Sequence, residues 1–273
     1  MLGMLQIILK NTLPVSLLNL LRSIREWEDN LYGWAMCNYK DLSVFLTFLL
    51  NRNLNVSVRD RFTIVMQLCV ISSAIDSAHT QAEMLNCIET ILLLPRNSRK
   101  CLVEAGCYKG SSTAKFSLAA DIAGRQLVVF DSFKGIPDND EPHTTDIFGN
   151  SANFKRGYYR GTLDEVKNNV AKYGKSDCCR FIEGWFEDTM PQFQQPISVI
   201  YLDVDLASST RTCLKHLYPL LEPGGVLFSQ DGHLPLVIDV LNDDNFWLDE
   251  VGCKKPEILG LGKSKLIKII KEA

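Results

Sequence analysis

Strands and helices alternate along the chain from residue 100 onward, and this order constrains the fold more than any other feature. Apolar segments of strand length, such as "CLVEAGC" and "QLVVFDSF", are separated by segments with helical spacing, such as "SSTAKFSLAADIAG". Alternation of this kind builds a mostly parallel sheet with helices on both faces. The final pair, "EILGLG" and "KLIKIIK", lacks an intervening helix, which indicates an antiparallel end. We predict a Rossmann-like α/β fold with a mostly parallel seven-stranded sheet and an antiparallel last strand.

The first 95 residues show helical spacing and no convincing strand. Thr80 followed by Glu83 predicts a capping box at the start of a helix that Pro95 closes. We therefore expect a helical N-terminal extension over 1–95, as a cover or homodimerisation element, and a ligand-binding domain over 96–273. The apolar start, "MLGMLQIILKNTLPVSLLNLL", is too interrupted to be an integral membrane segment. A packing or dimerisation helix is expected there, with attachment to a membrane surface as the alternative.

Composition limits the class of partner. The chain has 273 residues, of which 46% are hydrophobic and 22% are charged, as in ordinary globular proteins. Its net charge of -3 is too small to indicate a nucleic-acid partner. Nine cysteines are scattered without a C-x-x-C motif. We interpret them as reduced thiols rather than a disulfide or zinc framework, and expect a cytoplasmic protein.

The first strand ends in a glycine turn, "VEAGCYKGSS", that contains Glu104, Gly106, Gly110 and Ser112. It is not the G-x-G-x-x-G turn that holds a pyrophosphate at a helix N-terminus. An acid at the edge of the turn would repel a pyrophosphate but would suit a cationic ligand. S-adenosylmethionine, with its sulfonium and ammonium groups, fits this description. A tight strand–helix turn without any ligand is the alternative.

The next two strand ends carry groups suited to an adenosine. The second strand ends in Asp131, followed by Ser132, near the spacing at which an acid binds ribose hydroxyls. The third ends in Glu183, Gly184 and Trp185, where an adenine would find an apolar face and a polar edge. Asp131 as a helix cap and Trp185 as a core residue are the alternatives.

Acidic residues also end the fourth and fifth strands. Asp203 closes "VIYLD", and Gln230 with Asp231 closes "GGVLFSQD". Oxygen ligands from neighbouring strand ends suit a hard dication such as Mg²⁺. A metal there could orient a substrate hydroxyl towards a methyl donor, with Asp203 or Asp205 taking the proton. For Asp205, capping the helix that starts near Ser208 is an equal alternative.

Two histidines are candidates for contact with substrate. His233 follows Asp231 and is a candidate catalytic residue, whereas His143 lies in the long loop 137–161, which has the character of a lid. A solvated surface position is the alternative for both. Other candidates for the mouth of the site lie at the end of the same loop, namely Tyr158, Tyr159 and Arg160.

Five motifs in order resemble the macrocin O-methyltransferase family. They are "VEAGCYKGSS", "FDSFKGIP", "GWFEDTMP", "YLDVDLASST" with "LYPLLEPGG", and the acid after the fifth strand. The resemblance implies a class I S-adenosylmethionine-dependent enzyme that uses Mg²⁺ to methylate a sugar hydroxyl of a natural product. It also implies that Glu104, Gly106 and Gly110 line the methionine part of the cofactor. Asp131 would then hold the ribose, residues 183–185 would border the adenine, and Asp203 would serve as metal ligand and base.

The chain departs from that family at one position. Two adjacent aspartates are usual after the fifth strand, where this chain has Gln230 and Asp231. An amide oxygen binds a hard cation without bringing charge, so metal affinity should drop. The resemblance implies a hydroxylated, sugar-containing small molecule as the acceptor, and methyl transfer carries over better than this substrate does. A non-sugar hydroxylated metabolite, or an S-adenosylmethionine-binding protein with impaired metal function, is the alternative.

Overall fold

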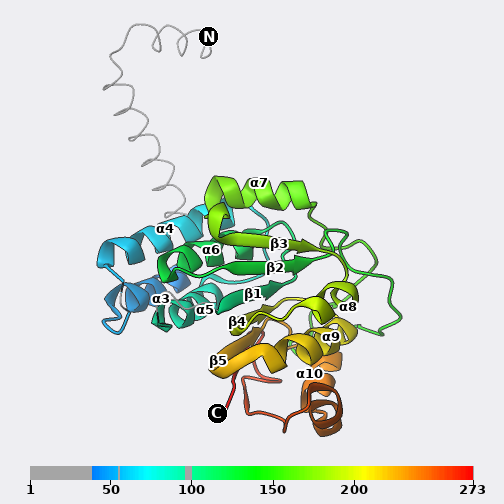
Figure 1. Cartoon of the computed structure of the whole chain (residues 1–273). Coiled ribbons are helices and arrows are strands. Elements are labelled where there is room, and N and C mark those ends of the chain that lie inside the picture. The colour runs from blue at the N-terminus through cyan, green and yellow to red at the C-terminus, as the bar shows by residue number, and fades with distance from the viewer. Residues whose placement is uncertain (1–38, 55, 96–99, 273) are drawn as a thin grey trace, which may run out of the picture.

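The computed structural model describes residues 39–54, 56–95 and 100–272 (Figure 1). Helices alternate with strands after the first three helices. The described α-helices are α3 (Tyr39–Leu50), α4 (Val58–Ala74), α5 (Gln81–Leu93), α6 (Ser111–Ala123), α7 (Leu163–Tyr173), α8 (Phe186–Thr189), α9 (Ala207–Leu217) and α10 (Pro235–Asn242). A π-helical turn, η4 (Phe246–Val251), follows α10. The strands are β1 (Cys101–Ala105), β2 (Leu127–Asp131), β3 (Cys179–Glu183), β4 (Ile197–Leu202), β5 (Leu221–Ser229), β6 (Ile258–Leu259) and β7 (Ile267–Ile270).

The seven strands form one sheet in the order β3-β2-β1-β4-β5-β7-β6. Strands β1 to β5 pair in parallel, whereas β7 runs antiparallel to both β5 and β6. The predicted fold class, including the antiparallel end of the sheet, is therefore confirmed. In this topology the chain reverses its direction of travel between β1 and β4, and the ends of these two strands meet at the switch point.

Alternate residues of each central strand belong to different hydrophobic clusters. On β1, Leu102 packs in a cluster with helices α3 to α6, whereas Val103 packs in a second cluster with α9 and α10. The same alternation occurs on β2, where Val129 faces the first cluster and Phe130 the second. The sheet is thus buried on both faces, which explains why its strands read as nearly continuous apolar runs.

Helices α3, α4 and α5 add a layer to one face of the sheet (Figure 1). Thr80 and Glu83 form the predicted capping box at the start of α5. These helices share their hydrophobic cluster with α6 and the sheet, so the division of the chain at residue 95 stays a prediction. The helix expected near the N-terminus, and any dimer formed through it, concern residues outside the described ranges.

No helix among the described residues is both long enough and apolar enough to cross a membrane. Seven of the described cysteines are free thiols, which agrees with the prediction at those positions. Cys69 departs from it, because this residue is disulfide-bonded.

Candidate functional site

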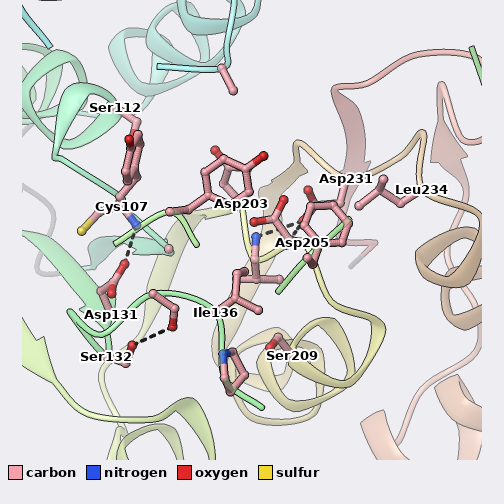
Figure 2. Close-up of a pocket in the computed structure, with 18 of the residues that line it drawn as sticks. Cys107, Ser112, Asp131, Ser132, Ile136, Asp203, Asp205, Ser209, Asp231 and Leu234 are labelled. Atoms are coloured by element: carbon pink, nitrogen blue, oxygen red, sulfur yellow. Dashed lines mark hydrogen bonds between the residues drawn. The ribbon is translucent and has the colours of Figure 1, made fainter. Parts of the chain in front are cut away.

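A cavity of about 210 Å³ opens at the carboxyl ends of the parallel strands. It is bounded on one side by the segment before α5 and on another by the loop between β2 and α7. Figure 2 shows Cys107 and Asp131 on one side of this cavity and three aspartates grouped on the other. The predicted site residues that line it are Gly106, Ser112, Asp131, Ser132, Gly184, Trp185, Asp203, Asp231 and His233.

Four predicted site residues are not among those lining the cavity. Glu104 is fully buried beneath α6, where its Oε2 accepts a hydrogen bond from Thr113 Oγ1 at 2.6 Å. Gly110 is the N-cap of α6, and Glu183 is exposed at the end of β3. Gln230 is buried, and its Oε1 accepts a hydrogen bond from the Tyr201 hydroxyl at 3.3 Å. Roles for these four residues in binding remain predictions.

Glycine at position 106 allows the ends of β1 and β4 to approach closely. Gly106 has a φ of +80°, and a Cβ atom there would overlap the carbonyl oxygen of Asp203. Its own N–H donates to Phe130 O at 2.9 Å. The residue therefore needs both the left-handed backbone and the absence of a side chain. This close contact places Asp203 next to the first turn.

Asp131 organises the turn after β1. Its Oδ2 accepts a hydrogen bond from Cys107 N at 2.8 Å, and its Oδ1 accepts one from Phe133 N at 2.6 Å. Burial raises the pKa of Asp131, and these two N–H groups counteract the rise. A carboxylate oxygen has more than one lone pair, so both oxygens can still accept from a diol. Trp185 lies in the same wall and offers an aromatic face.

The carboxylates of Asp203, Asp205 and Asp231 form the charged end of the cavity. One oxygen from each lies within 4.8 Å of the others. Asp231 Oδ2 accepts hydrogen bonds from Val204 N at 3.0 Å and from Asp205 N at 3.1 Å. Burial, together with the charge of Asp231, raises the pKa of Asp203 to about 7. Burial, together with the charges of Asp231 and Asp203, raises the pKa of Asp205.

This donor set fits a divalent cation. Three carboxylates that repel one another would gain from a hard cation placed between them, and oxygen ligands are those that Mg²⁺ prefers. Asp205 takes the place in the group that the sequence assigns to Gln230. The Gln230 amide instead lies against Tyr201 inside the fold. The structure thus assembles a third carboxylate although residue 230 is not an aspartate.

Asp205 does not cap α9. The helix begins at Ala207, and its N-cap residue is Leu206, which offers no side-chain acceptor. The cap is supplied by Glu141, whose carboxylate accepts hydrogen bonds from Ala207 N at 2.8 Å and from Ser208 N at 2.9 Å. Of the two alternatives for Asp205, the helix cap is therefore wrong.

The predicted lid loop contacts α9 and His233 at several points. Besides the contact of Glu141 with α9, Ile147 N donates to His233 O at 3.0 Å. The ring of Phe148 stacks on that of His233, with centroids 6.1 Å apart. In Figure 1 this loop, between β2 and α7, extends beyond the strand ends. Residues of this loop form one wall of the cavity.

The two candidate histidines have different surroundings. His233 lines the cavity, and burial lowers its pKa, which favours the neutral imidazole. His143 is not among the lining residues, and its Nε2 lies 2.9 Å from Glu141 Oε2. It belongs to the contact between the loop and α9 rather than to the cavity wall. Of the aromatic residues expected at the mouth, Tyr159 lines the cavity.

Several lining residues could not be predicted from the sequence, because they lie in segments without a recognisable motif. His79 precedes the Thr80 capping box, and Lys265 lies in the connection between β6 and β7. Asp146 lies in the lid loop, where Phe148 N and Asn150 N donate to its Oδ1. The run "TDIFGN" carries the signature of an aspartate turn, which is the one signal that could have marked this residue.

Comparison with known proteins identifies relatives of this chain. The model of the family Macrocin-O-methyltransferase (TylF) matches residues 77–242, more than half of the chain. A tetracenomycin-C rhamnosyl 4'-O-methyltransferase of Streptomyces olivaceus is 34% identical over 58% of this chain and 61% of its own length. The mycinamicin III 3''-O-methyltransferase of Micromonospora griseorubida is 32% identical over 52% of this chain and 59% of its own length. The chain thus spans about six tenths of the length of these two relatives.

Solved structures show the same fold. The O-methyltransferase NovP superposes with a TM-score of 0.63 at 22% identity, over 78% of this chain and all of that one. The calicheamicin methyltransferase CalS11 superposes with a TM-score of 0.54 at 16% identity, over 85% of this chain and 91% of that one. At these identities the likeness bears on architecture alone.

Proposed function

Because the chain belongs to the Macrocin-O-methyltransferase (TylF) family, we propose that it is an S-adenosylmethionine-dependent O-methyltransferase. Its acceptor would be a hydroxyl of a sugar in a glycosylated natural product. One observation carries the proposal: the carboxylates of Asp203, Asp205 and Asp231 lie within 4.8 Å of one another in the cavity that Asp131 and Trp185 also line. A site for a cation and a site for an adenosine therefore share one space.

The cavity suits the two ends of the cofactor differently. Asp131 can accept from ribose hydroxyls, and Trp185 can stack on adenine. At the other end, acidic groups would favour the positive sulfonium over a neutral or anionic group. Glu104 Oε1 is buried without a hydrogen-bond partner among the described residues. Burial raises the pKa of Glu104 to about 8, so an ammonium near this strand end would stabilise its ionised form.

Asp203 is the proposed base. Mg²⁺ at the three carboxylates would supply Lewis-acid assistance by lowering the pKa of the acceptor hydroxyl. The hydroxyl proton passes to Asp203 as the acceptor oxygen bonds to the methyl carbon. The bond between that carbon and sulfur breaks, so the sulfonium becomes a neutral thioether. Without a metal, burial and the charge of Asp231 raise the pKa of Asp203 to about 7. A cation held by the three carboxylates would lower this pKa and keep Asp203 ionised, so that the residue can accept the proton.

His233 and the lid loop would position the acceptor. His233 lines the cavity beside the acidic cluster and is held by Phe148 and by Ile147 N of the loop. A neutral imidazole offers one donor and one acceptor to sugar hydroxyls. Because the loop forms one wall of the cavity, it would also limit the access of water during transfer.

Mass spectrometry with isotope-labelled S-adenosylmethionine tests the activity. The native protein, incubated with a panel of rhamnosylated natural products and matched aglycones, should label a glycosylated member, and a chelator should abolish the product. Asp203→Asn should lose the product while calorimetry shows retained cofactor binding. The control is Asp177→Asn, an exposed residue before β3, which should keep native turnover. Equal turnover by native protein and Asp203→Asn would contradict the proposed base.

The absence of the usual second aspartate at Gln230 favours one other candidate, a cofactor-binding protein with weak metal function. The two candidates differ in their response to Mg²⁺ in calorimetry. The methyltransferase proposal expects a heat of Mg²⁺ binding that Asp205→Asn reduces. Cofactor binding without any Mg²⁺ binding would favour the second candidate. Labelling of an aglycone instead of a glycoside would place the acceptor among non-sugar metabolites.

A further inference from the structure

Two adjacent cysteines lie at the start of β3, the end of the strand that is away from the cavity. Cys178 is the last residue of the 3₁₀ turn η1 (Ser176–Cys178), and Cys179 is the first residue of β3. Both residues are partly exposed. Four of the other described thiols are buried, namely Cys87, Cys101, Cys107 and Cys213. The proposed function makes no use of this accessible pair of thiols.

The two sulfur atoms converge on one backbone oxygen. Cys178 Sγ is placed to donate to Lys175 O at 3.2 Å, and Cys179 Sγ is placed to donate to the same oxygen at 3.3 Å. Successive side chains within a strand point to opposite faces. Cys178 precedes the strand, and its thiol therefore lies on the same side of the chain as that of Cys179. The pair is thus a dithiol rather than two independent cysteines.

The surroundings of the two thiols give them different reactivity. Once Cys178 loses its proton, the Cys179 thiol donates to its sulfur, which lowers the pKa of Cys178 although burial and the charge of Asp121 act in the opposite direction. The same hydrogen bond, together with burial, raises the pKa of Cys179. Burial also raises the pKa of Cys253, another partly exposed thiol. Because the thiolate is the reactive form of cysteine, Cys178 is the activated thiol of the pair.

We propose that Cys178 and Cys179 form a modification site for hydroperoxides, in which Cys178 is the nucleophile and Cys179 is the resolving thiol. The Cys178 thiolate attacks the terminal oxygen of the peroxide, the O–O bond breaks, and the departing alkoxide takes a proton to become an alcohol. Cys178 is then a sulfenic acid. Cys179 attacks its sulfur, and the hydroxyl leaves as water with the thiol proton. Two thiols are thus oxidised to a disulfide while one peroxide is reduced by two electrons.

A disulfide between neighbouring residues is strained and therefore reversible. Consecutive Cα atoms of a trans peptide are about 3.8 Å apart, whereas those of disulfide-bonded residues usually lie about 4.4–6.8 Å apart. Strain of this kind makes a disulfide easier to reduce. A thiol reductant should therefore restore the pair readily.

The position of the pair in the sheet allows the backbone to adjust. Strand β3 lies at the edge of the described sheet and pairs with β2 alone (Figure 1). Cys179 opposes Leu127 at the first position of this ladder, and its N–H donates to Ser176 O. Closure of the ring changes the backbone at these two contacts, so hydrogen exchange at the start of β3 should accelerate on oxidation. The pairing of Asp131 with Glu183, at the far end of the ladder, should be unaffected.

Peptide mapping after treatment with hydrogen peroxide tests the proposal on the full chain. The protein is oxidised, alkylated and digested with trypsin, which cleaves after Lys175 and after Arg180 and releases "SDCCR" with both thiols and no other cysteine. We expect this peptide to be lighter by two hydrogen atoms and free of alkylation, and a thiol reductant should restore both alkylation sites. Because only a thiolate reacts, its oxidation should be about tenfold faster than that of Cys253.

Single variants assign the two roles. In Cys179→Ser the resolving thiol is missing, so the sulfenic acid at Cys178 should persist and react with dimedone. In Cys178→Ser neither a dimedone adduct nor a disulfide should form at Cys179. The matched control is Cys253→Ser, which removes a partly exposed thiol elsewhere and should leave the oxidation of "SDCCR" within about twofold of native.

Three outcomes would overturn the proposal. If "SDCCR" keeps both thiols while Cys253 is oxidised, the pair is not activated. If Cys178 of the native protein proceeds to a sulfinic acid without a disulfide, Cys179 is not a resolving thiol. A disulfide that joins two chains, seen as a dimer on a non-reducing gel, would exclude the step within one chain. None of these results depends on methyl transfer, so the proposed function stands or falls separately.

Discussion

The carboxylate of Asp231 accepts a hydrogen bond from the backbone N–H of Asp205 at 3.1 Å. Asp231, which follows β5, thereby holds the backbone of Asp205, which follows the neighbouring strand β4. Asp205 has a φ of +63°, a left-handed conformation that is uncommon outside glycine. Because Val204 N donates to the same oxygen at 3.0 Å, Asp231 supports the whole turn between β4 and α9. The residue is both a candidate metal ligand and the support of its neighbour.

Removal of the Asp231 acceptor should destabilise the protein. In Asp231→Ala the N–H groups of Val204 and Asp205 lose their partner, at a cost of about 1–3 kcal/mol for buried donors. Asp231→Asn removes the same charge but keeps an amide oxygen that can accept. Urea denaturation should therefore give a lower midpoint for the alanine variant than for the asparagine variant. Equal midpoints would show that the two hydrogen bonds contribute nothing to stability.

Gly106→Ala should be far more damaging than an alanine at another left-handed glycine. A Cβ at position 106 overlaps the backbone of Asp203, whereas Gly149 has a similar φ of +83° and nothing within 4 Å of the added atom. Gly149→Ala then measures backbone strain alone, about 1–2 kcal/mol. We expect the difference between the two variants in unfolding free energy to exceed that value, together with lost cofactor binding in Gly106→Ala only.

The stability of the cofactor-free protein should depend on pH through Glu104. Its pKa is raised by burial from 4.5 to about 8, so the folded state favours the protonated form. The resulting stabilisation is fully present below pH 4.5 and is lost as pH rises through about 8. Glu104→Gln lacks this dependence, so its Tm should rise relative to that of the native protein as pH increases from 4.5 to about 8. The exposed variant Glu257→Gln should follow the native curve.

Lys115→Met should stabilise the protein, because it removes a fully buried amine. Burial lowers the pKa of Lys115 from 10.5 to about 7, so the folded state favours the neutral amine. That contribution is present above pH 10.5 and is lost as pH falls through about 7. The Tm advantage of the methionine variant should therefore grow as pH decreases. Lys263→Met, at an exposed position, is the control, and a parallel advantage there would contradict the assignment.

Loss of the Glu141 carboxylate should loosen the start of α9. Glu141→Ala leaves Ala207 N and Ser208 N without their acceptor, which should cost about 1 kcal/mol, as for other helix caps. Hydrogen exchange at these two amides should accelerate. Asp138→Ala breaks an exposed pair with Arg156 in the same loop and should cost less. Unchanged exchange at both amides in Glu141→Ala would mean that the cap is formed by water.

The sheet could be predicted because its signal is local. Each central strand is a short apolar run bounded by a turn, and the absence of a helix between β6 and β7 predicts their antiparallel pairing. The acids at strand ends were equally visible, because parallel strands bring their carboxyl ends to one edge. Asp131, Asp203 and Asp231 all line the cavity for that reason.

The directions of side chains after the strands could be predicted less well than the order of the strands. Gln230 and Asp231 lie in the turn that follows β5, where no regular period predicts the direction of a side chain. Asp231 lines the cavity, whereas Gln230 lies against Tyr201. The contribution of Asp205 depends on a left-handed backbone that no residue type specifies by itself.

Long-range contacts could not be predicted at all. His79 and Lys115 are 36 positions apart, and the carboxylate of Glu141 reaches an amide 66 positions away. Neither spacing carries a periodic or turn signal. Only the packing of α4, α5 and α6, and the path of the lid loop, bring these groups together.

The dependence of α9 on Glu141 has a consequence for exchanging parts between relatives. A loop grafted from another member of the family, in order to alter the proposed acceptor selectivity, replaces residues 137–161 as a unit. If the graft carries no acid at the position of Glu141, two amides next to Asp205 face an apolar interior or water. Chimaeras that change selectivity would then lose turnover for an unrelated reason, unless the first turn of α9 is transferred with the loop.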